Sequence, residues 1–430
     1  MATPVLSVTP ADELIDVPRR IRVERLAPGR QVAIATRTLR NGVEWRSEAL
    51  FTAGADGVVD LERDAPVSGS YGGVSPMGLL WSQSPVGSKS REAFNQPVAE
   101  PLVTEVAASV DGQQLQATLV QRLAAEGVTR REVREDGLVG TLYLPAGPGP
   151  HPAVVVLNGS GGGINEPRAA LYASRGFAAL ALAYFKAPGL SDYISNTPLE
   201  YFQQGLRWLR RELRPLHDFV AVSGQSRGGE LVLLLGATFA KEVSAVVAYV
   251  PSAFVHSGQN ACDPKIGREG PTWLLDGKPL THLWENNRTA SWAPYDDGPE
   301  PRRHDRAMRT ALQDPEALAR ARILVENIEG PVMLLSATDD GSWPSSIYSR
   351  IVRDRLAEVQ HPHDVQWLDF ENAGHSILFP YVPTTQLVYA HPVSGKVSTS
   401  GGNAADNARA DEQSWDGVLR FLRGAVAARG

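Results

Sequence analysis

The sequence has a single cysteine, Cys262, so no disulfide can form within the chain. No cysteine and histidine cluster has the spacing of a structural zinc site, and we expect neither a metal nor a cofactor. Residues 1–7 lack the basic start and apolar stretch of a secretory signal, and the C-terminus carries no peroxisomal address. No apolar run approaches the ~20 residues needed to cross a bilayer. These absences predict a cytoplasmic protein that does not span a membrane.

The chain also lacks an excess of basic residues. Its 430 residues include 42 Lys or Arg and 48 Asp or Glu, which gives a formal net charge of -6. A nucleic-acid-binding protein normally carries a concentrated basic face, so no nucleic-acid partner is expected. The hydrophobic fraction of 43% is ordinary for a globular protein, and the length favours two domains.

Residues 1–135 have the period-of-two pattern of antiparallel strands. Apolar side chains alternate on both sides of Asn41-Gly42 and again on both sides of Asp111-Gly112. Asn-Gly and Asp-Gly are the preferred two-residue hairpin turns. We therefore predict that residues 1–135 form a β-sandwich domain, and we find no catalytic cluster in it.

Residues 136–430 follow a different pattern, in which short apolar runs alternate with helical stretches. The runs resemble strands buried on both faces and lie at residues 153–157, 177–183, 219–222, 243–250 and 332–335. Such alternation predicts an α/β fold with a mostly parallel sheet and helices on both faces. Residues 251–325 break the rhythm, and we interpret them as an insertion near the site. Residues 398–407 are interpreted as a surface loop.

The strongest local motif is Gly-x-Ser-x-Gly around Ser226, between an apolar strand and an apolar helix. In a nucleophile elbow the serine occupies a strained turn, and the flanking glycines Gly224 and Gly228 avoid clashes where strand meets helix. The alternative is a glycine-rich connection without chemistry. The strand-turn-helix context favours Ser226 as a nucleophile and predicts the α/β-hydrolase fold.

A serine nucleophile needs a general base, and the base needs an orienting acid. In α/β-hydrolases these follow in the order Ser, Asp or Glu, His. His375 follows the last apolar strand in a Gly-His loop and is the predicted base. Its rivals are His361 and His363, which precede that strand, and His391, which lies in a polar loop.

Asp339 and Asp340 follow the preceding strand, so either could be the acid. We predict Asp340, because the acid loops of this fold often have an apolar residue and a proline shortly after the aspartate, as in Asp340 to Pro344. Asp339 is then a turn or capping residue.

Catalysis also requires two backbone N–H groups that stabilise the oxyanion. One is predicted at Arg227, the residue after the nucleophile. The second is predicted in the glycine-rich loop at residues 158–163, at Ser160 or Gly161. This loop is not a phosphate-binding P-loop, because no Gly-Lys-Ser/Thr follows it. Tyr184 ends a buried strand at the same edge and is predicted either to bind substrate or to pack in the core.

The sequence resembles the acyl-CoA thioester hydrolase and bile acid-CoA:amino acid N-acyltransferase family over nearly its whole length. The most specific match is Pro76 to Trp81, which a generic hydrolase has no reason to carry. The other matches are residues 25–29, 60–63, 69–75, 139–145, 159–163, 182–185, 199–202 and 228–231, the pairs Asp339-Asp340 and Gly374-His375, and Trp343. The resemblance implies that Ser226, Asp340 and His375 are catalytic and that the substrate is an acyl-CoA. Arg227 departs from the lysine or leucine of many relatives, and residues 251–325 match poorly.

The resemblance leaves several functions open. Family members with a serine nucleophile resemble thioesterases, whereas those with cysteine resemble N-acyltransferases, since a thioester acyl-enzyme reacts readily with amines. Ser226 therefore favours an acyl-CoA thioesterase. The alternatives are an acyltransferase acting on an amine or alcohol, a carboxylester or lactone hydrolase, and a non-catalytic binding protein with a hydrolase fold.

Overall fold

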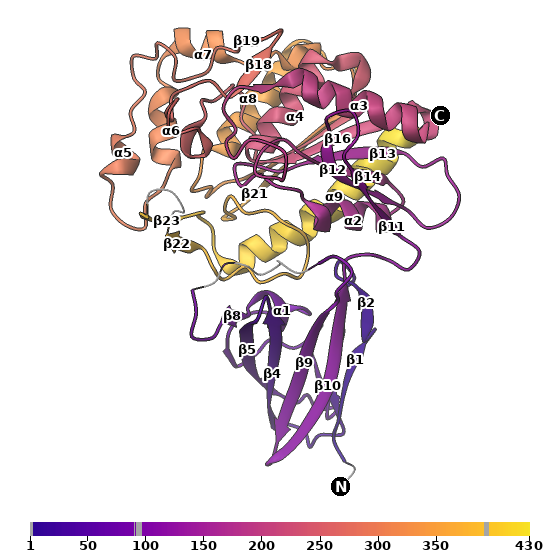
Figure 1. The fold of residues 1–430 in the computed structure, drawn as a ribbon. Coiled ribbons are helices and arrows are strands. Elements are labelled where there is room, and N and C mark those ends of the chain that lie inside the picture. Colours follow the sequence, from indigo (N-terminus) through magenta and orange to yellow (C-terminus); the bar gives the residue numbers. More distant parts are fainter. Residues whose placement is uncertain (1–2, 90, 92–96, 391–394) are drawn as a thin grey trace. The chain divides into compact units, whose positions relative to one another are not determined.

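The computed structural model describes residues 3–89, 91, 97–390 and 395–430. Contacts divide the chain into two compact units (Figure 1). The first contains Met1–Ala124, Leu378–Tyr389 and Asn403–Gln413, and the second contains Ala125–Ile377, Ala390–Gly402 and Ser414–Gly430.

The first unit is a β-sandwich, as predicted. Within its described residues, β1 (Val5–Thr9), β3 (Arg20–Glu24) and β6 (Val59–Asp60) form one sheet. The second sheet has the order β2-β10-β9-β4-β5-β7, with β8 paired to β5. Its strands are β2 (Asp12–Leu14), β4 (Gln31–Arg40), β5 (Val43–Thr52), β7 (Ser68–Gly69), β8 (Ser84–Pro85), β9 (Leu102–Val110) and β10 (Gln113–Arg122). Ile21 and Val23 of the first sheet join Val32, Ile34 and Phe51 of the second in one hydrophobic core.

Both predicted hairpin turns are confirmed. β4 and β5 pair from Arg40↔Val43 onwards, and β9 and β10 pair from Val110↔Gln113 onwards. The two turn residues of each hairpin have positive φ, 48° and 75° in the first and 49° and 80° in the second. Asn, Asp and Gly tolerate this left-handed backbone best, which is why these dipeptides occur at the turns.

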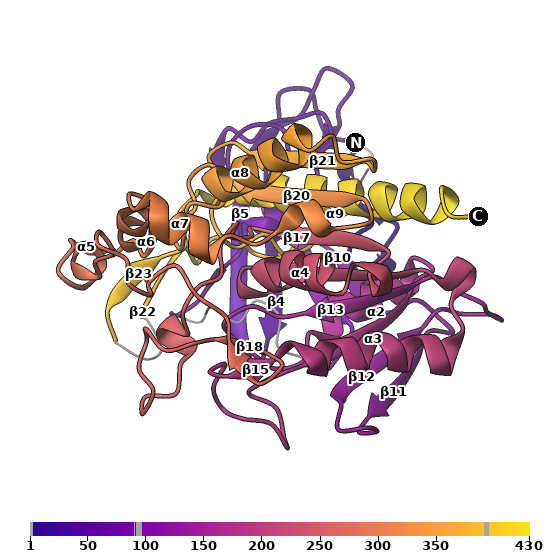
Figure 2. The same cartoon turned by 90° about the horizontal axis from the view of Figure 1, so that it is seen from above.

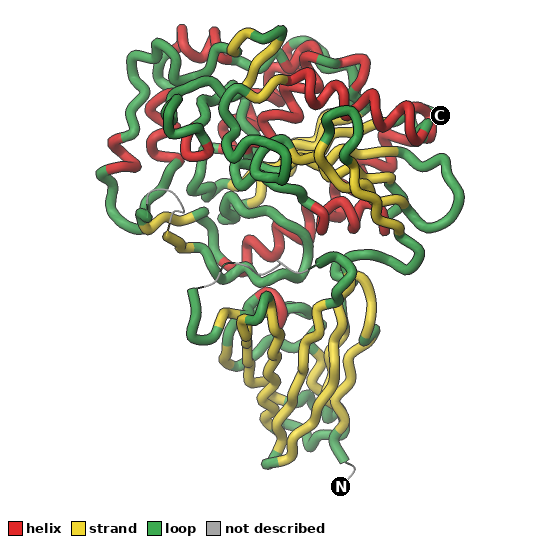
Figure 3. The backbone as a smooth tube through the Cα atoms, in the orientation of Figure 1, coloured by secondary structure: helices red, strands yellow, loops and turns green. Residues whose placement is uncertain are grey.

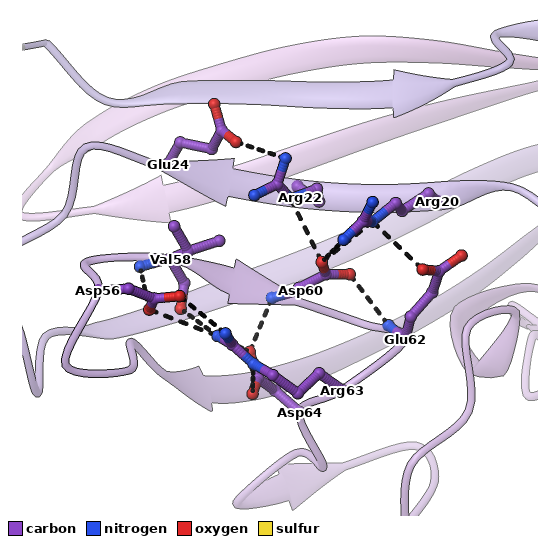
Figure 4. Close-up of polar contacts among 9 residues, drawn as sticks. All are labelled: Arg20, Arg22, Glu24, Asp56, Val58, Asp60, Glu62, Arg63 and Asp64. Atoms are coloured by element: carbon purple, nitrogen blue, oxygen red, sulfur yellow. Dashed lines mark hydrogen bonds and ion pairs between the residues drawn. The ribbon is translucent and has the colours of Figure 1, made fainter.

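A network of charged side chains holds the turn after β6 (Figure 4). Asp60 accepts a hydrogen bond from Arg20 at 2.6 Å and also pairs with Arg22, while Arg63 pairs with Asp56 and Asp64. Burial opposes the charged form of Asp60, but the hydrogen bonds from Arg20 and the Glu62 N–H and the charges of Arg20 and Arg22 together outweigh it, so the pKa of Asp60 lies below its ordinary value. The motif at residues 60–63 therefore has a structural role in the sandwich.

The second unit contains the α/β-hydrolase sheet. Over the described residues its order is β11-β12-β14-β13-β16-β17-β20-β21. β11 is antiparallel to β12, and β12 is antiparallel to β14. From β14 to β21 all neighbouring strands are parallel. The strands are β11 (Thr129–Val133), β12 (Val139–Leu144), β13 (Ala153–Leu157), β14 (Ala178–Ala183), β16 (Val220–Gln225), β17 (Ala245–Tyr249), β20 (Val332–Ala337) and β21 (Val365–Phe370).

Helices cover both faces of this sheet (Figure 2). The helices are α2 (Glu166–Ser174), α3 (Leu199–Leu213), α4 (Arg227–Thr238), α8 (Ser345–Glu358) and α9 (Ala404–Ala427). Gly236 of α4 lies against Val246, whereas Gly417 of α9 lies against Met333. Val246 pairs in register with Val332, the neighbour of Met333, and successive strand residues point to opposite faces. α4 and the later part of α9 therefore pack on opposite faces.

Residues 251–325 form the predicted insertion between β17 and β20. They contain the short elements η3 (Gln259–Ala261), β18 (Trp273–Leu275), β19 (Lys278–Pro279), α5 (Ala293–Asp296), α6 (Asp305–Ala311) and α7 (Pro315–Ala321). Figure 3 shows long loops between these helices. Nevertheless, the insertion packs against the sheet, because one hydrophobic core of the second unit contains Trp273, Leu283 and Tyr295 together with the strand residues Val222 and Val246.

The compact units do not follow the predicted boundary at residue 135. β11 lies before that boundary, yet Val133 pairs with Gly140 of β12 in the second sheet. Two later segments, 378–389 and 403–413, belong to the first unit. The division into domains at 1–135 and 136–430 stays a prediction, because compactness does not test which parts fold independently.

Candidate active site

Ser226 occupies the turn between β16 and α4, where the motif predicted a nucleophile elbow. Its backbone has φ 59° and ψ -118°, a conformation that costs of order 1–3 kcal/mol and is typical of active sites. A Cβ at Gly224 would lie 2.2 Å from the carbonyl oxygen of Gly228, and one at Gly228 would lie 2.6 Å from that of Asn158. The two motif glycines are therefore required by close backbone approach.

The structure brings Ser226, Asp340 and His375 together. His375 Nε2 lies 2.7 Å from Ser226 Oγ, and His375 Nδ1 lies 2.8 Å from Asp340 Oδ2. The three residues follow β16, β20 and β21, whose carboxyl ends meet at one edge of the parallel sheet. The Asp340 side chain is 1% exposed and that of His375 is 14% exposed, so the imidazole lies nearer to solvent than the carboxylate.

Asp339, the other candidate acid, faces away from His375. Its Oδ1 lies 2.7 Å from Arg303 Nη1, and its Oδ2 accepts the N–H of Gly402 at 2.9 Å. Asp340 Oδ1 instead accepts the N–H groups of Ser342 and Trp343 at 2.8 and 3.1 Å. The loop after β20 thus places the Asp340 side chain towards His375 and the Asp339 side chain towards Arg303 and Gly402.

The rival histidines are not near Ser226 among the described residues. The rings of His361 and His363 meet edge to face with centroids 5.4 Å apart, and His361 Nε2 contacts the carbonyl of Gly330, at the opposite end of the strands. His391 lies outside the described residues. Cys262 is half-buried, its N–H bonds to Gln259, and burial raises the pKa of its thiol.

The glycine-rich loop lies directly beside the nucleophile. A Cβ at Gly159 would be 3.6 Å from Ser226 Oγ. Within the loop, the N–H groups of Gly162 and Gly163 donate to Gly159 and Phe185. Those of Ser160 and Gly161 have no backbone acceptor among the residues described here, and Arg227 N–H stands in the open first turn of α4. These three N–H groups are free to receive an oxyanion, and that role stays a prediction.

Tyr184 holds this loop in place. Its hydroxyl donates to the carbonyl of Asn158 at 2.6 Å, and its ring packs against Phe202 and Trp273. The side chain of Asn158 in turn donates to the carbonyl of Gly162. The structure therefore gives Tyr184 a packing and positioning contact, and its predicted contact with substrate stays a prediction.

A buried polar cluster lies behind the elbow. Arg227 and Glu230 form an ion pair at 2.9 Å with both side chains fully buried, and Glu230 also accepts from Trp273 at 2.8 Å. Burial outweighs these contacts and raises the pKa of Glu230. His256 stacks on Trp343, and burial keeps its pKa well below the ordinary value. An isolated histidine in an irregular segment gives no periodic signal, which is why sequence reasoning missed it.

The interpretation of residues 398–407 as a surface loop was wrong. Ser398 and Ser400 are buried, and the carbonyl of Ser400 accepts the N–H groups of both His375 and Gly341. Asp340 and Gly401 also form an antiparallel bridge. The polar residues of this segment are therefore not a sign of solvent exposure. Its backbone pairs with the loop after β20 that carries Asp340 (the acid loop) and with the loop after β21 that carries His375 (the base loop).

Gly374 should not tolerate a side chain. A Cβ there would lie 2.2 Å from the carbonyl oxygen of Gly401. We expect Gly374→Ala to lower the free energy of unfolding by roughly 1–3 kcal/mol and to reduce activity, because the clash moves His375. Urea unfolding measures the first effect. Gly424→Ala is the control, since its Cβ would meet nothing within 4 Å, and an equal loss there would contradict the argument.

Comparisons with known proteins agree with the resemblance. Residues 16–135 match the acyl-CoA thioester hydrolase/BAAT N-terminal region, and residues 197–428 match the BAAT / acyl-CoA thioester hydrolase C-terminal region. The chain belongs to the acyl-CoA thioester hydrolase and bile acid-CoA:amino acid N-acyltransferase family.

Both branches of the family are among the similar proteins. Acyl-coenzyme A thioesterase 6 of Mus musculus is 31% identical, with 97% of this chain and 96% of the relative covered. The mouse peroxisomal succinyl-coenzyme A thioesterase is 30% identical, with the same shares covered. The mouse bile acid-CoA:amino acid N-acyltransferase is 28% identical, with 97% of each chain covered. The name of one relative places it in peroxisomes, so a cytoplasmic location for this family member stays a prediction.

No helix in the described part of the chain is long and apolar enough to span a membrane.

Proposed function

We propose that the protein is a serine-dependent acyl-CoA thioesterase that releases free acid and CoA through an acyl-enzyme. The observation that carries the proposal is the 2.7 Å contact between His375 Nε2 and Ser226 Oγ at a strained elbow, in a chain of this family. A hydroxyl alone is a weak nucleophile, and a base within hydrogen-bond reach is what activates it.

The geometry suggests a role for each residue. An ionised carboxylate accepts hydrogen bonds but donates none, so His375 Nδ1 carries the hydrogen that faces Asp340. His375 Nε2 is then unprotonated and acts as the base. Ser226 Oγ attacks the thioester carbonyl while Nε2 takes its proton. The resulting oxyanion is stabilised by the N–H of Arg227 and by that of Ser160 or Gly161. His375 returns the proton to the CoA sulfur as the C–S bond breaks.

The second half of the cycle repeats the first with water as nucleophile. His375 takes a proton from water, the hydroxide attacks the acyl-enzyme ester, and Ser226 leaves as the restored hydroxyl with the proton from His375. The acid is released. A serine ester discriminates less in favour of amines than a cysteine thioester does, and this difference supports hydrolysis over transfer.

The acyltransferase branch supplies a second candidate function. The mouse bile acid-CoA:amino acid N-acyltransferase aligns over 97% of this chain, so transfer to an amine is chemically close to the proposed hydrolysis. An incoming amine would take the place of water against the same acyl-enzyme.

One experiment tests these possibilities together. Short, medium, long and branched acyl-CoAs are incubated with the protein, with and without amino acids, and free thiol, acid and amide are all quantified. A parallel set contains oxyesters and lactones in place of the acyl-CoAs. We expect thiol and acid to form in equal amounts and no amide to accumulate. Amide formation at the expense of acid would make the protein an acyltransferase. Cleavage of oxyesters or lactones but of no acyl-CoA would overturn the thioester substrate.

A further inference from the structure

Arg303, in the insertion between β17 and β20, binds three acceptors on the loop after β20, the acid loop, and a fourth acceptor within the insertion. Its Nη1 lies 2.7 Å from Asp339 Oδ1, and its Nη2 donates to the carbonyls of Asp339 and Asp340 at 3.3 and 3.0 Å. Its Nε lies 3.1 Å from Asp305 Oδ1. A planar guanidinium has several donors in fixed directions, so it can hold two neighbouring carbonyls and a carboxylate at once. The ammonium of a lysine at this position would not match this geometry.

The contacts reach the residue that orients His375. The Asp340 side chain is fixed by the N–H groups of Ser342 and Trp343 on one oxygen and by His375 on the other. Its backbone carbonyl, on the other side of the same residue, is fixed by Arg303. The aspartate is therefore held from both its side chain and its main chain.

The partner carboxylate extends this arrangement to the base loop. Asp339 Oδ1 faces Arg303, and Asp339 Oδ2 accepts the N–H of Gly402. Ser400, two residues earlier, accepts the N–H of His375 through its carbonyl. A chain of contacts thus runs from Arg303 through Asp339 and residues 400–402 to the backbone N–H of His375.

Neighbours of Arg303 make further contacts with the same loop. The N–H of Asp305 donates to the carbonyl of Gly341 at 3.2 Å, and His304 Nδ1 lies 2.9 Å from the carbonyl of Ser342. Arg302 and Ser398 form a parallel bridge. The Arg303 side chain is 23% exposed and pairs with Asp305, which is 5% exposed, and with Asp339, which is 45% exposed. The guanidinium is therefore more enclosed than the fully solvated ion pairs that contribute little to a structure.

We propose that Arg303 is a positioning residue for catalysis, which sets the place of Asp340, and through Asp339 that of His375, relative to Ser226. The inference rests on the proposed function of these three residues. It gives a catalytic reason for the Asp339-Asp340 pair, in which one carboxylate orients the imidazole and the other anchors the loop. It also assigns a role to part of residues 251–325, where the family resemblance is weak.

The test compares Arg303→Ala with wild-type protein in three measurements. We expect kcat for the best acyl-CoA to fall by up to about 10²-fold with KM changed less than twofold, because misplaced catalytic groups slow the chemical step. The rate at which a fluorophosphonate labels Ser226 should fall in parallel. Added guanidinium ion should restore part of kcat, since it can occupy the space left by the side chain.

Arg288→Ala is the matched control. Arg288 lies in the same insertion and pairs with Asp314 at 2.7 Å, but its side chain is 63% exposed and, among the described residues, it forms no hydrogen bond or ion pair with the acid loop. It should keep wild-type kcat and labelling rate and show no guanidinium effect. Arg303→Lys carries the same test if the alanine variant does not fold, with a smaller fall expected.

The labelling rate separates this inference from the proposed function, because the probe contains no CoA. Absence of Ser226 labelling in the wild type would overturn the nucleophile itself. Normal labelling with no acyl-CoA cleavage would overturn only the substrate. A wild-type labelling rate and kcat in Arg303→Ala, or a loss confined to KM, would overturn the role of Arg303.

Discussion

Replacing Ser226 with alanine is expected to lower kcat for acyl-CoA hydrolysis by about 10⁶-fold, the loss seen when a triad nucleophile is removed. The hydroxyl oxygen is the atom that bonds to the acyl group, and Ser226 is the only hydroxyl or thiol residue in the elbow at residues 224–228. Loss of the covalent step leaves only binding and oxyanion stabilisation, which by themselves give a residual rate above that in water.

Thiol release and mass spectrometry measure the effect of Ser226→Ala. The wild-type protein trapped with a slow substrate should gain the mass of one acyl group, and the variant should not. Ser223→Ala is the control, because Ser223 lies on the same strand, is buried and contacts the hydroxyl of Tyr172 at 3.0 Å. It should lose some stability and keep its acyl-enzyme. Hydrolysis by Ser226→Ala at the wild-type rate would rule out the nucleophile.

Asp340→Asn should have the second largest effect, a fall in kcat of about 10⁴-fold. The amide can donate a hydrogen bond to His375 Nδ1, which then presents its hydrogen at Nε2 and cannot accept the proton of Ser226. The structure predicts no gross movement, because the N–H groups of Ser342 and Trp343 still find the amide oxygen.

Asp339→Asn, one residue earlier, is the natural comparison. The asparagine keeps one side-chain oxygen but loses the negative charge that pairs with Arg303. We therefore expect kcat of Asp339→Asn to fall by at most about 10²-fold, as for Arg303→Ala. Steady-state kinetics of the two variants decide the assignment. A larger loss in Asp339→Asn than in Asp340→Asn would reverse the roles of the two aspartates.

Local chemistry explains why much of this protein could be predicted. The Asn41-Gly42 and Asp111-Gly112 turns form where predicted because few other residues accept two successive positive φ angles. Gly224 and Gly228 mark the elbow because any Cβ there would overlap a carbonyl oxygen. Each of these signals depends on residues close in sequence, so the sequence alone contains it.

The convergence of the three site residues could also be predicted, because the parallel sheet brings together the loops that carry them. Parallel strands place their carboxyl ends at one edge, and residues that follow β16, β20 and β21 must therefore lie near one another. The strand pattern and the fold rule for acid loops pointed to Asp340 and His375, and the structure brings both to Ser226.

By itself, then, the sequence determined the two fold types, the elbow and the order in which the site residues follow the strands. Only the tertiary structure decided what holds them: Arg303 on the acid loop, Ser400 beside His375, and Trp273 of the insertion on Glu230 under the elbow. It also decided that β11 joins the second sheet. The physical reason is that backbone carbonyls and buried charges find partners across long loops, and no residue type or period in the sequence records which carbonyl will lie opposite which donor.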